Sequence, residues 1–206
     1  MIRLVNVLSR YFIVLEGIDG SGKTTIAKAL VTALNSANVK ALYTYEPYNP
    51  DFIEMIKKYG KDFGGVMEAL LMAVDRYYHV ERVVKPYLNM GYSVVSDRYF
   101  YSSLAYQGAR GVSLEWIKTL NEFAPKPSLA IYLDVSPEEG LKRKLNVATK
   151  IKYMEEDPEF LRKVREIYKR LVSEGFLIEV DASRNYEVVF QDCVNLVCRK
   201  LGLLCT

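Results

Sequence analysis

The segment that most constrains this chain is a glycine-rich run between an apolar stretch and a helical pattern. It matches the pattern G-x-x-x-x-G-K-[ST] and reads Gly17-Ile18-Asp19-Gly20-Ser21-Gly22-Lys23-Thr24. Glycines let the backbone curl into a nest of N–H groups around phosphate oxygens, and the next helix adds its positive N-terminal end there. We expect Lys23 to reach the outer phosphates and the Thr24 hydroxyl to ligate Mg²⁺. A plain glycine-rich turn would fit the same letters, but the flanking strand and helix favour a nucleoside triphosphate site.

The composition is that of an ordinary globular chain. Its 206 residues, half of them apolar and 26% charged, fit one domain over residues 1–206. A net charge of +3 suits a small anionic ligand and is too small to predict a nucleic-acid partner. No apolar run is long enough to span a bilayer, and residues 1–10 lack the order of a signal peptide, so we expect a cytoplasmic protein without a membrane partner. The cysteines are expected as small buried residues of the last helix: Cys193, Cys198 and Cys205.

Strand patterns alternate with helical patterns along the chain. Strands are expected at residues 11–16, 39–45, 92–96, 129–133 and 176–180. Helices are expected at residues 24–36, 52–59, 66–90, 102–107, 114–123, 137–145, 158–174 and 186–201. Pro86 should kink or end the longest of them. The alternation predicts a P-loop NTPase-type three-layer α/β fold, with a parallel five-stranded sheet and helices on both faces. Residues 146–157, between two helices, are expected to form a short mobile lid.

A second polar set follows the strand at residues 92–96. Asp97 stands where P-loop proteins place a carboxylate that holds Mg²⁺, and the Arg98 guanidinium can grip a phosphate with two N–H groups. An ion pair of these two side chains with each other or with neighbours is the structural alternative. Ser103 and Gln107 lie four residues apart and would share a helix face that reads the edge of a base. From the pattern alone, Tyr106 fits a packing residue equally well.

Four segments resemble the thymidylate kinase family. The segment 97–108 is similar to the family signature D-R-[YH]-x-x-S-x-x-A-Y-Q, and the segment 15–20 to the family's form of the phosphate loop. The segment 133–143 resembles L-D-V-x-P-E…L-x-R, and the segment 159–168 resembles the helix that follows the lid. The similarity covers most of the chain, and residues 1–10 look like an extension.

The resemblance implies transfer of the γ-phosphoryl group of ATP to dTMP, with Mg²⁺ as cofactor. Lys23 and the loop amides would hold the ATP phosphates, and Arg143 would lie over the adenine. Thr24 and Asp97 would be the metal ligands. The implied ATP-binding set is Gly17, Ile18, Asp19, Gly20, Ser21, Gly22, Lys23, Thr24, Thr25 and Arg143.

The acceptor would lie on the other side of the loop. By resemblance, Asp19 would accept from the deoxyribose 3′-OH, Arg98 would hold the dTMP phosphate, and Tyr106 would crowd the 2′ side of the sugar. The implied dTMP-binding set is Asp19, Glu46, Met72, Arg76, Arg98, Ser103, Tyr106 and Gln107.

Several positions depart from the family pattern. Tyr45 stands where an arginine often precedes Glu-Pro, and Met72 stands where an aromatic ring usually stacks on thymine, which predicts looser base selectivity. Lys150 and Lys152 stand where arginines are common in the lid, and Gly20 stands where some members carry an arginine in the loop. The missing charge is then expected from Lys150 or Lys152 of the lid, which join Lys23 and Arg98 as the predicted catalytic residues; ordinary solvated lysines are the alternative.

Two other functions stay open on the sequence. One is a kinase for another deoxynucleotide or deoxynucleoside, and the other is a P-loop switch protein without transfer activity. The chain has no guanine-reading N-K-x-D segment. A homodimer is expected from the family, with the apolar stretch 66–74 as its candidate face, although core packing explains that stretch equally well.

Overall fold

A five-stranded parallel sheet organises the computed structural model, which describes residues 2–3, 10–145, 157–202 and 204–205. Its strand order is β3-β4-β2-β5-β6, and all the pairings are parallel. The three central strands are buried at every residue, as both-sided coverage requires. The prediction of a parallel five-stranded sheet is confirmed. The strands are β2 (Phe12–Glu16), β3 (Ala41–Tyr45), β4 (Ser93–Asp97), β5 (Leu129–Asp134) and β6 (Ile178–Asp181).

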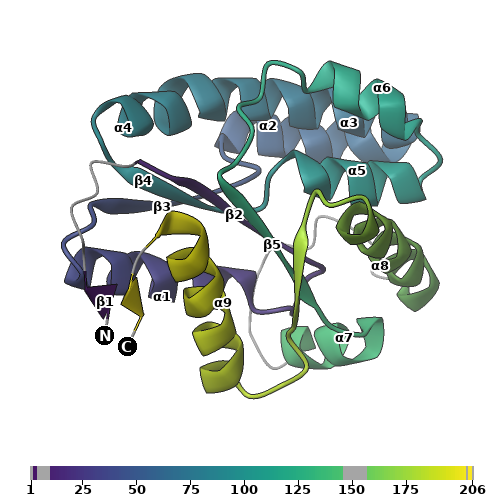
Figure 1. Cartoon of the computed structure of the whole chain (residues 1–206). Helices are drawn as coiled ribbons and strands as arrows, with labels where there is room; N and C mark the ends of the chain where they lie inside the picture. The colour runs from purple at the N-terminus through teal and green to yellow at the C-terminus, as the bar shows by residue number, and fades with distance from the viewer. Residues whose placement is uncertain (1, 4–9, 146–156, 203, 206) are drawn as a thin grey trace.

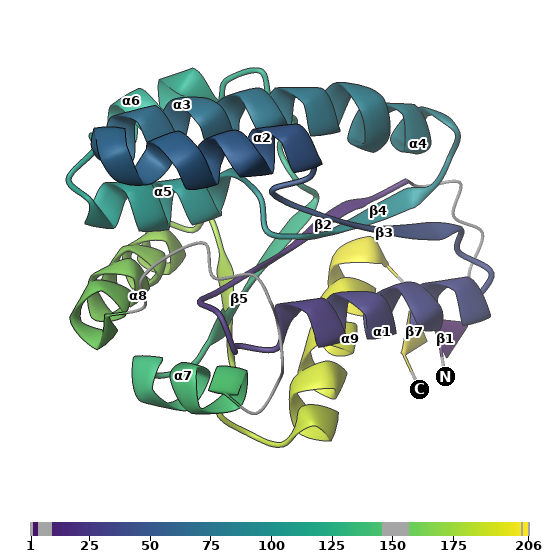
Figure 2. The same cartoon turned by 180° about the vertical axis from the view of Figure 1, so that it is seen from behind.

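Helices cover both faces of this sheet, which makes the predicted three layers. One face carries α1 (Lys23–Ser36) and α9 (Tyr186–Leu201), which lie below the sheet in Figure 1. The larger group lies above the sheet in the same view and also when the molecule is seen from behind (Figure 2). That group consists of α2 (Pro50–Met55), α3 (Lys61–His79), α4 (Lys85–Asn89), α5 (Phe100–Ala109) and α6 (Leu114–Leu120). α8 (Pro158–Ser173) joins this face through the core that it shares with α5, and α7 (Pro137–Leu145) contacts α8.

Each face of the sheet has its own apolar core. Under α1 and α9, Ile13 and Leu15 of β2 pack with Ile26 and Leu30 of α1. On the opposite face, the strand residues pack against α5 and α8. Because successive strand residues point to opposite faces, β2 contributes to both cores in alternation.

The long helical region was predicted to kink or to end at Pro86, and the predicted end is wrong. α3 runs into a π-helical segment, Val80–Val84, and then directly into α4. A proline removes one backbone donor and its ring collides with the carbonyl four residues before it. The wider π turns immediately before Pro86 accommodate both effects, so the helical path continues without a break.

Two other helices have different bounds from those expected. α5 begins at Phe100, because buried Glu16 accepts the backbone N–H groups of Tyr99 and Ser102 and so satisfies that helix end. α2 begins at Pro50, where the side chain of Asn49 caps it by accepting from the N–H of Asp51 at 2.8 Å.

The ends of the chain form a small separate ribbon. β1 (Ile2–Arg3) pairs antiparallel with β7 (Leu204–Cys205), close to the end of α9 (Figure 1). Cys193 is a buried free thiol, as expected, whereas buried Cys198 is disulfide-bonded, which the sequence did not predict. In the described part of the chain, no helix has the length and apolar character needed to cross a membrane. Location in the cytoplasm stays a prediction.

Candidate active site

The glycine-rich loop joins β2 to α1 at the carboxyl edge of the sheet. Lys23 is buried inside it, and its Nζ donates to the Ile18 carbonyl at 2.8 Å and lies 3.5 Å from Ser21 Oγ. Burial, followed by the nearby charge of Arg98, lowers the pKa of the Lys23 ammonium to about 8. The Ile18 side chain is buried in the apolar core, so that residue offers only its backbone to a ligand.

Thr24 and Asp97 meet where β4 ends beside the start of α1. The Thr24 hydroxyl donates to Asp97 Oδ2 in a short hydrogen bond, while Asp97 Oδ1 is buried with no hydrogen-bond partner among the described residues. An orphaned carboxylate oxygen beside a hydroxyl is a donor set that suits a hard divalent cation. No cluster of three His, Cys, Asp or Glu side chains able to hold a metal unaided occurs in the described ranges. These two residues therefore fit a hard divalent cation that takes its remaining ligands from elsewhere.

Arg98 lies one residue further on, in a constrained position. Its φ of 75° is rare for a residue with a side chain, and its N–H donates to the Leu15 carbonyl at 2.9 Å. Nη1 donates to the Gly17 carbonyl at 3.3 Å and to Ser102 Oγ at 3.1 Å, and Nη2 pairs with the carboxylate of Asp19. The guanidinium lies over the ring of Tyr106, 5.2 Å from its centroid. The sequence left open whether Arg98 forms an ion pair with Asp97 or with another neighbour. In the structure its ion-pair partner is Asp19 of the glycine-rich loop.

Asp19 pairs with two cations, one at each carboxylate oxygen. One oxygen faces Arg98, and Oδ2 lies 3.2 Å from Nζ of Lys144, which comes from α7. Burial alone would raise the pKa of Asp19, but the positive charges of Arg98, Lys23 and Lys144 hold it well below its usual range. Asp19 is therefore an anion, and an entering phosphate would compete with it for both cations.

Glu16 is connected to Arg98 through the hydroxyl of Ser102. The carboxylate is fully buried at the end of β2 and accepts from Ser102 Oγ at 2.6 Å, which in turn accepts from Arg98. It also accepts from the Tyr168 hydroxyl at 2.9 Å, which connects α8 to the same point. Burial raises the pKa of Glu16 to about 7, although the Ser102 hydrogen bond and the Arg98 charge lower it.

All eight residues of the implied dTMP-binding set line a single cavity beside the loop, of about 710 Å³ including the space open to solvent. The other five residues that line it are outside the implied set: two come from strand–helix connections, one from α5 and two from α8. The complete lining is Asp19, Glu46, Pro47, Met72, Arg76, Arg98, Tyr99, Ser102, Ser103, Tyr106, Gln107, Phe160 and Leu161. We call this cavity the acceptor pocket.

Buried Arg76 is fixed at every nitrogen in the wall of the acceptor pocket. Its Nε donates to Glu46 Oε2 at 2.7 Å, Nη1 to Asn121 Oδ1 at 2.6 Å and Nη2 to Ser103 Oγ at 3.2 Å. His79 is buried behind Glu46, with Nδ1 3.0 Å from Glu46 Oε1, which agrees with a structural role. In the same wall, the buried Oε1 of Gln107 has no partner in the part of the chain that the structure describes.

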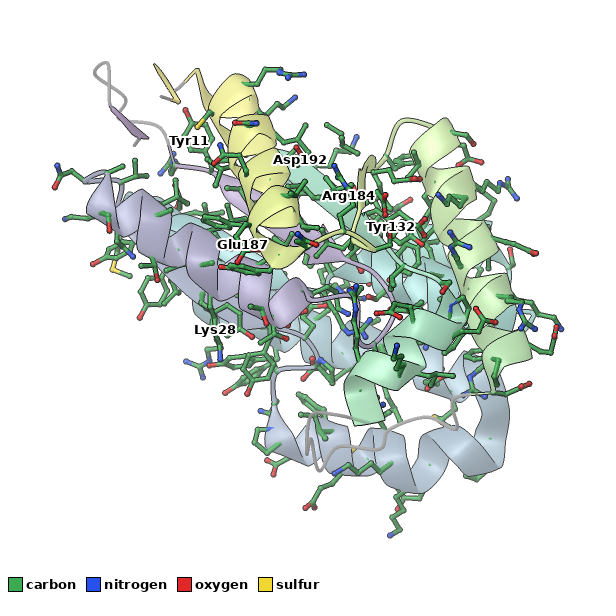
Figure 3. All side chains as sticks on the ribbon, turned by 90° about the horizontal axis from the view of Figure 1, so that it is seen from below. Tyr11, Lys28, Tyr132, Arg184, Glu187 and Asp192 are labelled. Carbon is green, nitrogen blue, oxygen red and sulfur yellow. The ribbon has the colours of Figure 1, made fainter. Side chains whose placement is uncertain are left out.

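A second cavity lies on the other side of the loop, between α1 and α9; we call it the donor pocket. Arg143 reaches it from α7 and donates to the carbonyls of Ala182 at 2.8 Å and Ser183 at 3.3 Å. Arg184, in the loop before α9, pairs with Asp192 at 2.5 Å, and Figure 3 shows the two side by side. The lining is Ser21, Gly22, Thr25, Ile26, Arg143, Ala182, Ser183, Arg184, Asn185, Tyr186 and Val189.

Some predicted residues lie elsewhere, and some contributors were missed. Lys150 and Lys152 fall outside the described residues. Tyr45 is 45% exposed and lines neither pocket. The polar loop at residues 182–186 follows the last strand of the sheet, and that position is the signal that could have indicated it. Nothing in the helical pattern singles out Lys144 from the other basic residues of α7.

One loop thus contributes to two cavities: Asp19 lines the acceptor pocket, and Ser21 and Gly22 line the donor pocket. A parallel sheet with this loop, a paired hydroxyl and carboxylate for a cation, and cations on both sides defines a P-loop protein of the phosphotransferase class. Comparison with known proteins gives the family. The thymidylate kinase family model matches residues 15–193.

Relatives of similar length agree with this match. The chain is 44% identical to the probable thymidylate kinase of Staphylothermus marinus, with 93% of this chain and 96% of that protein covered. It is 42% identical to the probable thymidylate kinases of Pyrococcus abyssi, with 93% and 97% covered, and of Pyrobaculum aerophilum, with 91% and 96% covered. The chain belongs to the thymidylate kinase family, and it is an enzyme that acts as a nucleotide kinase.

Proposed function

We propose that the protein transfers the γ-phosphoryl group of ATP to dTMP, giving dTDP and ADP, within one kinase domain. The observation that carries this proposal is the loop shared by the two pockets. Two nucleotides bound there would bring their phosphates to the same few residues, and alignment of the reactants is the main requirement of phosphoryl transfer.

ATP would bind with its phosphates in the loop and its adenine in the donor pocket. Buried Lys23 supplies the charge at the outer phosphates, and Arg143 borders the adenine end. The loop residues given for ATP in the sequence analysis, from Gly17 to Thr25, supply mainly backbone N–H groups, and Ile18 can supply nothing else. Thr24 and Asp97 would hold Mg²⁺, which neutralises charge on the ATP phosphates when bound.

dTMP would bind in the acceptor pocket with its phosphate toward Arg98. Asp19 lies where the 3′-OH would donate, and the ring of Tyr106 limits space at the 2′ side. Arg76, Ser103 and Gln107 form the wall that faces the base. The orphaned Oε1 of Gln107 supports this assignment, since a buried acceptor without a partner is costly unless a ligand satisfies it.

The reaction needs no side chain as a base. An acceptor phosphate oxygen, already anionic, attacks the γ-phosphorus; the bond to the β–γ bridging oxygen breaks, and ADP leaves with that electron pair. Lys23 and Arg98 offset the charge that spreads over the phosphoryl oxygens. We assign the lid to residues 146–157 and propose that Lys150 or Lys152 adds charge there, as the sequence predicts.

We further propose relaxed selectivity for the acceptor base. Met72 is the half-buried residue at the position where a stacking ring is usual, and it lines the acceptor pocket. A flexible thioether shapes that surface less sharply than an aromatic ring. Similar kcat/KM values for dUMP and dTMP are expected, and a large preference for dTMP would contradict this part of the proposal.

A homodimer through α3 is the proposed assembly. Four apolar side chains of this helix are exposed at helical spacing: Val66 at 53%, Leu70 at 38%, Val74 at 49% and Tyr77 at 54%. The apolar stretch at residues 66–74 therefore has two roles: its exposed side chains form the candidate dimer face, whereas Ala69, Leu71 and Ala73 are buried in the core. Light scattering should give a dimer, and Leu70→Glu should give a monomer.

The deciding experiment measures ADP release with ATP and a panel of acceptors: dTMP, dUMP, dCMP, dGMP and thymidine. Release that depends on dTMP supports the proposal. Dependence on dCMP, dGMP or thymidine alone would replace it with another deoxynucleotide or deoxynucleoside kinase. Slow hydrolysis independent of every acceptor would indicate a switch protein.

A further inference from the structure

α7 contacts the phosphate loop through a pair of glycines. Gly20 has a φ of 81°, and a Cβ on it would lie 2.0 Å from the carbonyl oxygen of Gly140 in α7. A Cβ on Gly140 would in turn lie 2.7 Å from the carbonyl oxygen of Asp19. Backbone atoms cannot yield as flexible side chains can, so neither position accepts a side chain in this arrangement. The loop therefore cannot carry a cation at residue 20 while α7 stays where it is.

The same contact aims a different cation at the loop. Residues four apart share a face of a helix, so Lys144 lies on the side of α7 that Gly140 presses against the loop. Its side chain is only 17% exposed, and its Nζ lies 3.2 Å from Asp19 Oδ2. The two neighbouring basic residues of α7 have other surroundings. Lys142 is exposed, and Arg143 donates to the carbonyls of Ala182 and Ser183 beside the donor pocket.

Lys144 thus lies at the junction of the two pockets. It shares Asp19 with Arg98, which approaches the same carboxylate from the acceptor side. Asp19 belongs to the loop that holds the donor phosphates, and it lines the acceptor pocket. Two cations converging on one anion in the ligand-free protein mark a place with an excess of positive charge, which is where a phosphoryl group needs it.

We propose that Lys144 is a further catalytic residue, which contacts the phosphoryl group in transfer and, together with the lid lysine proposed above, supplies the charge that the glycine at residue 20 excludes. The proposal rests on the proposed function. Lys144 takes no part in bond making: when the nucleotides bind, it exchanges some of its contact with Asp19 for an anionic phosphoryl oxygen. The close approach of Gly20 and Gly140 fixes how far α7 lies from the loop, and therefore how far the Lys144 side chain must extend to reach the phosphoryl group.

The first test compares Lys144→Met with Lys142→Met, which removes an exposed lysine two residues away. With dTMP and ATP, Lys144→Met should lower kcat by about 10²-fold while KM for either nucleotide changes by less than about 3-fold. Lys142→Met should match the wild type, and the melting temperatures of all three proteins should agree. Wild-type turnover of dTMP together with an unaffected Lys144→Met variant would overturn this inference and leave the proposed function standing. A wild type inactive on dTMP would overturn both.

The second test separates a catalytic role from a positioning one. If Lys144 acted only by orienting Asp19, Lys144→Met would cause no further loss in an Asp19→Asn background. If it contacts the phosphoryl group, kcat should fall again by a similar factor in that background. Lys144→Arg should retain more activity than Lys144→Met, since the charge remains. If the Asp19→Asn variant and the Asp19→Asn, Lys144→Met double variant had equal kcat, the proposal would be overturned.

Discussion

The two pockets on either side of the phosphate loop are built in different ways. The acceptor pocket is walled by buried side chains that brace one another, as Arg76, Glu46 and Ser103 do. In the donor pocket, Arg143 donates to the carbonyl oxygens of Ala182 and Ser183, and Arg184 pairs with Asp192, which is outside the lining. We therefore expect binding of the acceptor to depend on a braced set of side chains, and binding of the donor to depend more on the main chain and on buried Lys23 of the loop.

The largest effect should come from that cation. Lys23→Ala is expected to lower kcat by at least about 10³-fold, because Lys23 is the one lysine of the loop at residues 17–24 and its ammonium contacts the loop backbone where the phosphates would bind. The control is Lys28→Ala, which removes an exposed lysine of the same helix α1 (Figure 3) and should have no effect on kcat. A Lys23→Ala variant that keeps most of its activity would break the contrast between the two pockets.

The bracing of the acceptor pocket is tested next. Glu46→Ala leaves the guanidinium of Arg76 buried without its carboxylate, so unfolding should become easier by about 3–5 kcal/mol, and KM for dTMP should rise. Denaturant unfolding and steady-state kinetics measure both. Tyr45→Ala, at the exposed neighbouring position, is the control and should change neither value. If KM for ATP rose as much as KM for dTMP, the two pockets would not be separate units.

Above about pH 8, a pH effect should appear on the donor side. Below about pH 8 the buried Lys23 is protonated and can bind phosphate; above it the ligand-free enzyme loses that charge. The value of kcat/KM for ATP, which reports the free enzyme, should therefore fall about tenfold per pH unit above 8. kcat at saturation should persist to higher pH, since bound phosphates raise the pKa of Lys23. A profile for ATP that stays level through this range would contradict the lowered pKa.

The smallest effect concerns base selectivity. Met72→Phe restores a ring to the acceptor pocket and should raise the ratio of kcat/KM for dTMP over dUMP by roughly 3- to 10-fold. The matched control is Met67→Phe, on the same helix but in the lining of neither pocket. An unchanged ratio in Met72→Phe would mean that selectivity is set by the braced polar wall instead.

Much of the site could be predicted because its parts are local. The loop and Arg98 each follow a strand directly, Asp97 is the last residue of a strand, and parallel strands bring their carboxyl ends to one edge. Glu16 was missed because it reads as the last residue of an apolar strand, and only the fold shows that its carboxylate accepts from Ser102 and Tyr168. Residues of α8 that line the acceptor pocket were missed because helix periodicity specifies a face and not its neighbour.

The sequence by itself determined the sheet, the phosphate loop and the family, because strand and helix periods and a short motif are local properties of the chain. Only the tertiary structure decided how the charges are distributed around the loop. Gly20 is visible in the sequence as a missing cation, but the reason is a backbone contact with Gly140, far along the chain. That contact also brings Lys144 to Asp19, since the placement of one helix against one loop depends on packing between distant segments.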